Sequence, residues 1–475
     1  MADTILRVGL CGIGLEAYWP QFEGLQARLE GYVRQVSRRL EASGAVVEYL
    51  GLVDTPQRGR DAGHACRRAD IDLLVIYVTT YALSSTVLPL VQRAKVPVLV
   101  LNLQPSAAID YDAFNRLPDR TAMTGEWLAY CSACTVPEIA NVLLRAGLRF
   151  HQVTGVLGDE STWKEIEEWV EAARVKKALA DNRLGLLGHY YSGMLDIVTD
   201  LTQVSITFGS HIEQLEVDEL SALRASVSEA EVARRVEDFQ AAFDVPPDCG
   251  DDELARAART SVALDRLVEL HELSSLAYFY MGSGVAQNEE TMSSVILGTS
   301  LLTARGIPVA GEYEVKNALA MKILDCLGAG GSFTEYYALD LNADHVLMGH
   351  DGPGHLAIAE SKTKVRPLLV YHGKVGRGLS VEMSVRHGPV TLLAVVEDAA
   401  HGFKLVVAEG ESVPGEVLQI GNTNSHYRFP LGARGFVEAW NAQGPAHHCA
   451  IGVGHLSAKL RKLAQLMELP LFQVC

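Results

Sequence analysis

The chain has no surplus of positive charge and no long hydrophobic run. Its 475 residues include 41 Lys and Arg against 58 Asp and Glu, which gives a formal net charge of −17. That charge repels phosphate backbones and anionic lipid, so we expect neither nucleic acid nor a membrane surface as a partner. No stretch approaches the roughly 20 apolar residues of a spanning helix, and no signal-peptide cleavage site follows the first residues. We therefore expect a cytoplasmic protein.

Cysteine is present without the arrangement of a disulfide framework or of a zinc site. The eight cysteines are scattered through a long chain, which is typical of reduced, mostly buried thiols. One close pair, Cys131 and Cys134, has the CxxC spacing of half a zinc site or of a redox pair. Because the sequence contains no second CxxC, the pattern favours two residues that share one face of a helix.

The length and the order of apolar runs indicate three domains. At about 150 residues per domain, 475 residues correspond to three. In the first domain, residues 1–180, short apolar runs at 6–11, 71–78 and 96–103 alternate with helix-like segments. Continuous apolar runs of this kind predict a parallel sheet covered on both faces. The loop 12–16 after the first run is not a GxGxxG dinucleotide motif, because residue 17 is alanine.

The other two domains differ in their predicted elements. Residues 181–331 contain strand-like runs at 184–188 and 204–208 and a long amphipathic stretch at 253–276. In residues 332–475 strand-like runs predominate, at 367–371, 390–396, 403–407 and 417–420. We predict an α/β protein with doubly wound parallel sheets in the N-terminal and central domains and a mostly antiparallel, barrel-like C-terminal domain.

Carboxylates and imidazoles stand at the ends of apolar runs in the second half of the chain. Glu312 precedes a predicted helix at 315–327, Glu335 follows a glycine-rich turn, His350 begins the loop-like run HDGPGH, and His448 ends the sequence AHH. Each alone has a simple structural explanation, such as a helix N-terminal carboxylate or a surface histidine. Together they match the ligands of a divalent ion, and the nitrogen ligands favour manganese or cobalt over magnesium. Zinc is disfavoured because there is neither a thiolate cluster nor an HExxH helix.

The order of four short motifs resembles the L-arabinose isomerases and, more distantly, the L-fucose isomerases. The motifs are AGE at 310–312, GGSFTEY at 330–336, GH at 349–350 and AHH at 446–448. The four-part order is fairly specific, whereas each part alone is not, and the similarity extends weakly through almost the whole chain. The resemblance implies that Glu312, Glu335, His350 and His448 hold Mn²⁺, with Co²⁺ or Mg²⁺ as alternatives.

The resemblance also implies an aldose–ketose isomerase. Such an enzyme moves a proton between C2 and C1 of a sugar through an enediol, and Glu312 and Glu335 would carry out this proton transfer beside the ion. The expected partners are a small-molecule sugar and further copies of the chain, in a trimer or hexamer. The residues expected to contact the sugar are Glu16, Tyr18, His189, His355 and His447.

Two loops depart from the family pattern, which leaves the substrate and the reaction open. Residues 12–20 and 120–125 replace loops that shape the sugar end of the pocket in arabinose isomerases, so we expect a substrate other than L-arabinose. The same ligands could also serve a sugar epimerase, or a hydrolase that uses metal-activated water. A sugar-binding protein without turnover is a further alternative. The presence of both glutamates argues against it, because binding alone requires no proton-transfer pair.

Overall fold

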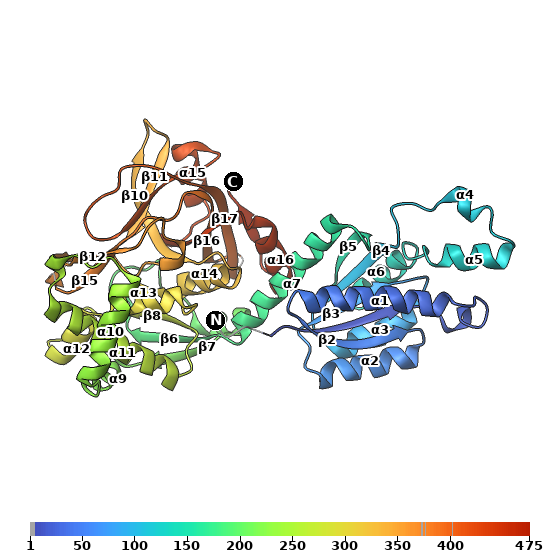
Figure 1. Ribbon diagram of the computed structural model, residues 1–475, viewed down its shortest axis with the longest axis horizontal. Helices are drawn as coiled ribbons and strands as arrows, with labels where there is room; N and C mark the ends of the chain where they lie inside the picture. The colour runs from blue at the N-terminus through green and yellow to red at the C-terminus, as the bar shows by residue number, and fades with distance from the viewer. Residues whose placement is uncertain (1–4, 372–373, 376, 401) are drawn as a thin grey trace. The chain divides into compact units, whose positions relative to one another are not determined.

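The computed structural model describes residues 5–371, 374–375, 377–400 and 402–475 (Figure 1). The chain divides into two compact units, the first ending at Lys177 and the second comprising residues 178–475. The first unit contains one parallel sheet, and the second contains a parallel sheet and a closed antiparallel barrel. The predicted fold class is therefore confirmed. The predicted domain boundaries at residues 180 and 331 stay a prediction.

The first unit is built on a five-stranded parallel sheet with the strand order β2-β1-β3-β4-β5. Its central strand β3 is buried at every position, as its uninterrupted apolar sequence LLVIYV predicts. The strands are β1 (Arg7–Ile13), β2 (Val46–Val53), β3 (Leu73–Val78), β4 (Val98–Gln104) and β5 (His151–Val156).

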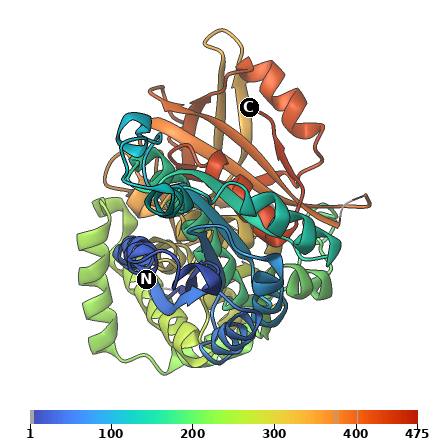
Figure 2. The same cartoon turned by 90° about the vertical axis from the view of Figure 1, so that its right-hand side faces the viewer.

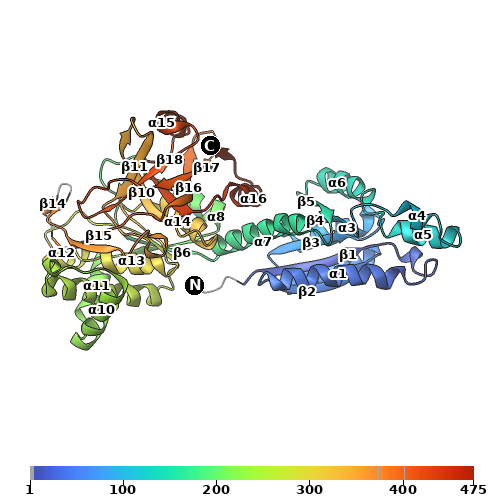
Figure 3. The ribbon, with the colours of Figure 1, turned by 45° about the horizontal axis from the view of Figure 1, so that its top comes forward.

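Helices cover both faces of this sheet, as Figure 3 shows. On one face α2 (Pro56–Arg68), α3 (Ser84–Ala94) and α6 (Thr135–Arg145) share a hydrophobic core with β1 and β3. On the other face lies α1 (Leu25–Ala42), where Gly12 leaves room for Val33. Three short elements come after the carboxyl ends of strands: η1 (Glu16–Tyr18) after β1, and α4 (Tyr111–Phe114) and α5 (Arg120–Leu128) after β4. The long helix α7 (Glu160–Ala180) follows β5.

The second unit begins with a four-stranded parallel sheet of order β7-β6-β8-β9. The strands are β6 (Arg183–Gly188), β7 (His211–Leu215), β8 (Ser275–Phe279) and β9 (Val309–Ala310). The helices around it are α8 (Leu201–Phe208), α9 (Val217–Ala225), α10 (Glu229–Ala242), α11 (Asp251–Leu270), α12 (Ala286–Met292) and α13 (Ile296–Ala304). A large apolar core joins α9, α10, α11, α12 and α13 to the sheet. Strand β7 lies on one side of β6 and strand β8 on the other, so the chain connections diverge at the carboxyl end of β6. In sheets of this kind ligands bind at that point.

Two predictions for this region are wrong. Residues 204–208 lie in helix α8 instead of a strand, because the Asp200 carboxylate accepts hydrogen bonds from the backbone N–H groups of Thr202 and Gln203 and so caps a helix. The amphipathic stretch 253–276 is also two elements. Helix α11 ends at Leu270, and Leu276 belongs to the buried strand β8.

Six strands of the C-terminal region close into an antiparallel barrel. Their order is β16-β19-β10-β11-β18-β17, and β17 pairs back with β16 along its length. The strands are β10 (Ser332–Asp340), β11 (His345–His350), β16 (Gly388–Asp398), β17 (Gly402–Val413), β18 (Thr423–Arg428) and β19 (His448–Val453), and the long pair β16 and β17 appears in orange in Figure 2. Closure pairs every strand edge of the ring, which removes the exposed edges of an open sheet.

Smaller elements surround the barrel. They are η3 (Leu356–Ile358), the pairs β12 (Lys364–Pro367) with β15 (Leu379–Glu382) and β13 (Val370–Tyr371) with β14 (Lys374–Val375), the helices α15 (Gly432–Asn441) and α16 (Ser457–Met467), and β20 (Leu471–Gln473). The predicted strand at 417–420 is wrong. The Asn424 amide bonds both the N–H and the C=O of Leu418, which satisfies that backbone without a strand partner.

Among the residues that the structure describes, no helix is both long enough and apolar enough to cross a membrane.

Helix α14 (Val315–Cys326) lies between the second parallel sheet and the barrel. Every residue from Val315 to Asp325 is buried, and the helix contacts β8 and β9 on one side and β16 and β19 on the other. A helix that is buried all round belongs to the core of a large protein. Its packing therefore sets the position of the barrel relative to the parallel sheet within the second unit.

The barrel tolerates no side chain at Gly349 on β11. A Cβ atom there would lie 1.8 Å from the Thr423 carbonyl oxygen of the neighbouring strand, so we expect Gly349→Ala to destabilise the protein by about 2 kcal/mol or more. The matched control is Gly435 within α15, where a Cβ meets only Leu431 at 3.4 Å. Gly435→Ala should be neutral or stabilising by up to about 1 kcal/mol. Urea unfolding followed by circular dichroism measures both, and equal effects would contradict this packing.

Candidate metal centre

Three neighbouring barrel strands bring three of the predicted ligands to one place. Glu335 on β10 is paired with His448 on β19 and, on its other side, with Gly349 on β11. His350 follows Gly349 as the last residue of β11. The run that begins at His350 was predicted to be loop, but the strand extends through His350 and the loop begins at Asp351. Strand pairing thus brings together groups that are far apart in the sequence.

Glu312 reaches the same place from the parallel sheet. Strand β9 ends at Ala310, and the chain enters α14 through Glu312 and Tyr313, which both adopt left-handed backbone conformations with φ of 55° and 64°. Each such residue other than glycine costs about 1 kcal/mol or more. The turn is held because the Tyr313 N–H donates to the Tyr278 carbonyl and the Glu314 N–H donates to the Gly311 carbonyl. Strain of this kind is characteristic of functional sites.

Three short distances connect the four predicted ligands in pairs. Glu312 Oε2 is 3.5 Å from His448 Nε2, Glu312 Oε1 is 4.0 Å from His350 Nε2, and Glu335 Oε2 is 4.0 Å from His448 Nε2. Two ligand atoms that each lie about 2.1 Å from an ion are separated by no more than about 4.2 Å. The structure therefore brings Glu312 and His448 within metal-ligand spacing of each other, and it places His350 beside Glu312 and Glu335 beside His448.

Two of these ligand atoms are buried without a hydrogen bond. Glu312 Oε2 and His448 Nε2 have no hydrogen-bond partner within the described parts of the chain. Buried polar atoms are nearly always paired, because an unpaired one costs about 1–3 kcal/mol. A carboxylate oxygen and an imidazole nitrogen that face each other at 3.5 Å are both satisfied by a cation between them. The donor set thus fits a divalent ion.

Glu314 orients His448 and was not predicted from the sequence. Its carboxylate accepts a hydrogen bond of 2.6 Å from His448 Nδ1, and both side chains are fully buried. When Glu314 is ionised it accepts the Nδ1–H, which leaves the Nε2 lone pair free to bind a metal. Burial raises the pKa of Glu314 to about 8 and lowers that of His448 to about 3, which keeps the imidazole neutral. The only signal for Glu314 in the sequence was its closeness to Glu312. That signal is weak, because a carboxylate at a helix N-terminus is common.

His350 is held in a different way. The Gly352 N–H donates to His350 Nδ1 at 3.1 Å, so in the neutral ring Nε2 carries the hydrogen and faces Glu312. To bind an ion through Nε2 the ring must adopt its other tautomer. The carboxylate of Asp351, 3.5 Å from Nδ1, is placed to accept the Nδ1–H of that tautomer. Burial lowers the pKa of His350, which keeps it neutral in either form.

His447 adds positive charge beside Glu312. Its Nδ1 lies 2.6 Å from Asp196 Oδ2 and its Nε2 lies 3.7 Å from Glu312 Oε2. These two carboxylates raise the pKa of His447 to about 9. The imidazoles of His447, His448 and His350 in turn lower the pKa of Glu312, although its burial opposes this. Glu312, His447 and His448 also lie close enough together to hold an ion as a group of three, but His447 is the poorer ligand because both its nitrogens face carboxylates.

The other residues that were predicted to contact the sugar lie in several different parts of the fold. His189 follows β6 at the carboxyl edge of the sheet and packs edge-on against Phe279. His355 is buried near the opposite end of α14, with Nε2 4.0 Å from Asp325, so the structure does not bring it to the four ligands. Glu16 and Tyr18 lie in η1 of the first unit. The part that these residues play in binding a sugar stays a prediction.

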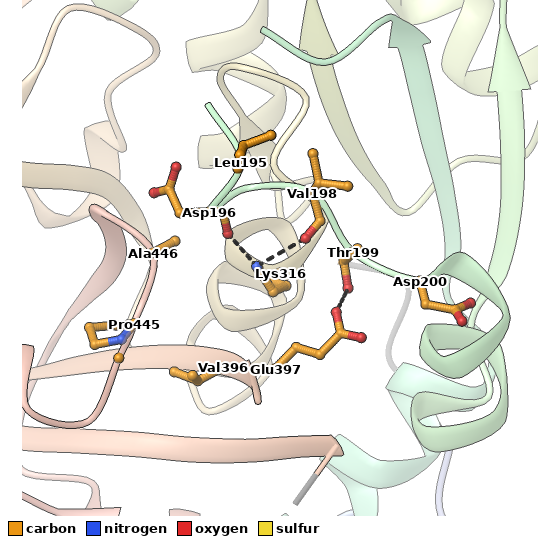
Figure 4. A pocket seen from close by; sticks show the side chains of 11 residues that line it. Leu195, Asp196, Val198, Thr199, Asp200, Lys316, Val396, Glu397, Pro445 and Ala446 are labelled. Atoms are coloured by element: carbon orange, nitrogen blue, oxygen red, sulfur yellow. Dashed lines mark hydrogen bonds between the residues drawn. The ribbon is translucent and has the colours of Figure 1, made fainter. Parts of the chain in front are cut away.

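A pocket of about 370 Å³ adjoins His447 within the second unit (Figure 4). Among the described residues that line the pocket, three carry a carboxylate and one carries an ammonium group. That ammonium belongs to Lys316, whose Nζ donates to the backbone carbonyls of Asp196, at 2.5 Å, and of Val198. The pocket reaches the metal centre through Asp196, which bonds His447. The lining residues include Asp196, Thr199, Asp200, Lys316, Glu397 and Ala446.

Known proteins resemble this chain most clearly in its C-terminal part. The L-arabinose isomerase C-terminal domain family matches residues 330–470. The chain is 27% identical over 342 residues to an L-arabinose isomerase from Nocardioides sp., covering 67% of this chain and just under two thirds (66%) of that protein. It is 24% identical over 436 residues to one from Klebsiella pneumoniae, covering 86% and 82%.

Two further similarities are more distant. A sulfoquinovose isomerase from Priestia aryabhattai is 20% identical over 337 residues, covering 70% of this chain and 73% of its own. Among solved structures, an ABC transporter solute binding protein from Burkholderia multivorans is 11% identical, covers 64% of this chain and 97% of its own, and has a TM-score of 0.17, which carries no argument about the fold.

The contact between His447 and Asp196 makes stability depend on pH. The pKa of His447 in the folded protein, about 9, exceeds its ordinary value of 6.5, so its contribution is complete below pH 6.5 and is lost as pH rises to about 9. Because both side chains are more than one third exposed, we expect Asp196→Asn to cost only about 1 kcal/mol near pH 6. That cost should shrink towards about pH 10.

Urea unfolding with a chelator present measures this pH dependence. Glu438→Gln on the exposed side of α15 is the control and should behave alike at both pH values. A cost for Asp196→Asn that grows with pH would contradict the assigned charge of His447.

Proposed function

We propose that this chain, which belongs to an arabinose isomerase-like family, is a metal-dependent aldose–ketose isomerase that acts on a sugar. The observation that carries the proposal is the pair of unbonded buried ligand atoms, Glu312 Oε2 and His448 Nε2, at 3.5 Å within the described part of the site. A second carboxylate, Glu335, lies 4.0 Å from His448 Nε2, and a second imidazole, His350, lies 4.0 Å from the other oxygen of Glu312, Oε1.

Glu312, Glu335, His350 and His448 would hold the ion. Two carboxylates with two imidazoles favour Mn²⁺, with Co²⁺ or Mg²⁺ as alternatives. A divalent ion bound there polarises neighbouring sugar oxygens and stabilises the negative charge of an enediolate. Glu314 holds the His448 ring in the tautomer that exposes Nε2. Asp351 would do the same for His350 through its carboxylate.

We assign the movement of the proton between C2 and C1 to Glu312 and Glu335. Both carboxylates are partly exposed, with 19% and 30% of their side chains accessible, so a substrate can reach them. In the aldose-to-ketose direction the C2–H bond breaks and a carboxylate takes that proton, the proton of the O2 hydroxyl passes to O1, and the carboxyl group delivers its proton to C1. Such proton transfer contributes about 10²- to 10⁴-fold in rate. His447, protonated between Glu312 and Asp196, can donate a hydrogen bond to a sugar oxygen.

The charges around the adjoining pocket favour a neutral sugar. Asp196, Asp200 and Glu397 offer acceptors to hydroxyl groups, whereas the ammonium group of Lys316, the one cation among the described lining residues, already donates to backbone carbonyls. A sulfonate, phosphate or carboxylate would meet net negative charge there. We further propose a substrate other than L-arabinose and a homo-oligomer, a trimer or hexamer, with Glu16, Tyr18 and His189 as further sugar contacts.

Turnover should require both the ion and the two glutamates. We expect metal-stripped protein to convert free aldoses to ketoses only after Mn²⁺ is added, and Glu312→Gln or Glu335→Gln to reduce kcat by about 10²- to 10⁴-fold. Glu438→Gln should leave the rate unchanged. A colorimetric ketose assay over neutral aldoses and sugar acids measures this. Inert sugars with intact Mn²⁺ binding would point to another reaction, such as epimerisation or hydrolysis, or to binding without turnover.

Glu314 should control metal affinity without contacting the ion. Glu314→Gln keeps the size of the side chain but cannot ionise to accept the His448 Nδ1–H when a cation binds at Nε2, so we expect Mn²⁺ binding to weaken about 10- to 100-fold. Calorimetric titration of metal-free protein measures it, again with Glu438→Gln as the control. Unchanged affinity in Glu314→Gln would mean that His448 does not bind the ion through Nε2.

A further inference from the structure

The two cysteines of the CxxC sequence lie together in the first unit. Cys131 and Cys134 are in the turn between α5 and α6, with Cys134 as the residue that precedes the first turn of α6. Their Sγ atoms are 2.9 Å apart, and both are free thiols. The interpretation of this pair as two residues on one helical face is wrong, because the turn brings the sulfur atoms into contact.

The turn is fixed to the carboxyl edge of the sheet. The Thr80 hydroxyl beyond β3 donates to the Leu128 carbonyl, and the Gln104 amide at the end of β4 donates to the Tyr130 carbonyl. The Thr135 hydroxyl, which follows Cys134, donates back to the Thr80 carbonyl. These bonds hold the backbone on both sides of the pair, so the two thiols stay near each other without a covalent link.

The two thiols differ in access. Cys134 is exposed, whereas Cys131 is buried. An oxidant from solution therefore meets Cys134 first, and Cys131 lies next to the sulfur that has reacted. This is the arrangement of an attacking thiol with a resolving thiol.

We propose that Cys131 and Cys134 form a reversible disulfide that makes the carboxyl edge of the first unit responsive to low-molecular-weight disulfides such as glutathione disulfide. The Cys134 thiolate attacks one sulfur of the oxidant, which forms a mixed disulfide and releases one small thiol. The Cys131 thiolate then attacks the Cys134 sulfur and releases the second small thiol. The protein loses two electrons and two protons, and the small disulfide gains them.

The pair lies beside a residue that we expect to contact substrate. Burial, and then the nearby Cys131, Tyr81 and Cys134, raise the pKa of the Tyr18 phenol, which places both thiols in its surroundings. In a reducing compartment the Cys131–Cys134 disulfide is transient, as is usual for disulfides that regulate. The proposal does not depend on the isomerase activity.

Peptide mass after thiol trapping tests the proposal directly. Trypsin releases residues 121–145 as one peptide that contains both cysteines and no other. The full-length protein is equilibrated in glutathione buffers from reduced to oxidised, quenched with acid, alkylated with N-ethylmaleimide and digested. In the oxidised buffer we expect this peptide without alkylation and lighter by two hydrogen atoms, and dithiothreitol should restore two alkylated thiols.

Two controls separate this disulfide from general thiol reactivity. The partly exposed Cys326 and Cys475 lie in other tryptic peptides and should gain at most a glutathione adduct. In Cys131→Ser the exposed Cys134 should accumulate as its glutathione adduct, because no resolving thiol remains. The proposal is overturned if the wild-type peptide stays doubly alkylated in the oxidised buffer, or if it carries a stable glutathione adduct. Protection from alkylation without the loss of hydrogen would indicate a bound metal and would overturn it as well.

Discussion

The burial of α14 is the constraint on which the second unit depends. The helix is enclosed on all sides, so the turn that precedes it and the turn that follows it can each take only one course. The preceding turn presents Glu312 in a left-handed conformation, and Glu314 is the residue directly before the helix. The following turn leads into β10, which carries Glu335. A single buried helix therefore sets the positions of carboxylates from the parallel sheet and from the barrel.

The barrel contributes the imidazoles because closure fixes its register. A shift of one residue in the pairing of β10 with β19 would turn His448 to the other face of the sheet. The hydrogen bond from His448 to Glu314 then joins the barrel to the first turn of α14. A buried charged group destabilises a protein unless a hydrogen-bond partner or an opposite charge compensates it. This contact therefore favours one position of the barrel relative to α14. The same contact prepares Nε2 for a cation, which links stability to the chemistry of the site.

The three histidines of the site differ in pKa and therefore suit different roles. His448 and His350 are buried and have lowered pKa values, which suits neutral ligands. His447 is half-exposed between two carboxylates and has a raised pKa, which suits a charged hydrogen-bond donor. Adjacent residues in the sequence AHH thus differ in function although their rings are in contact, because Nδ1 of His447 meets Asp196 and Nδ1 of His448 meets Glu314. Their order in the sequence carries no information on this division.

The sequence alone determined the fold class and the identity of four candidate ligands. Apolar runs report burial of whole strands, and the motifs around Glu312, Glu335, His350 and His448 mark the ends of elements, where rigid support meets solvent. Local capping by Asp200 and side-chain bonding by Asn424 overrode two predicted strands, because these hydrogen bonds depend on geometry that propensity does not contain. Only the tertiary structure separated His355 from the ligands, recruited Glu314 and Asp196, and placed the Cys131 and Cys134 sulfur atoms in contact. Each of these outcomes depends on strand register, helix packing or the course of a turn, which bring distant residues together by contacts that no local pattern records.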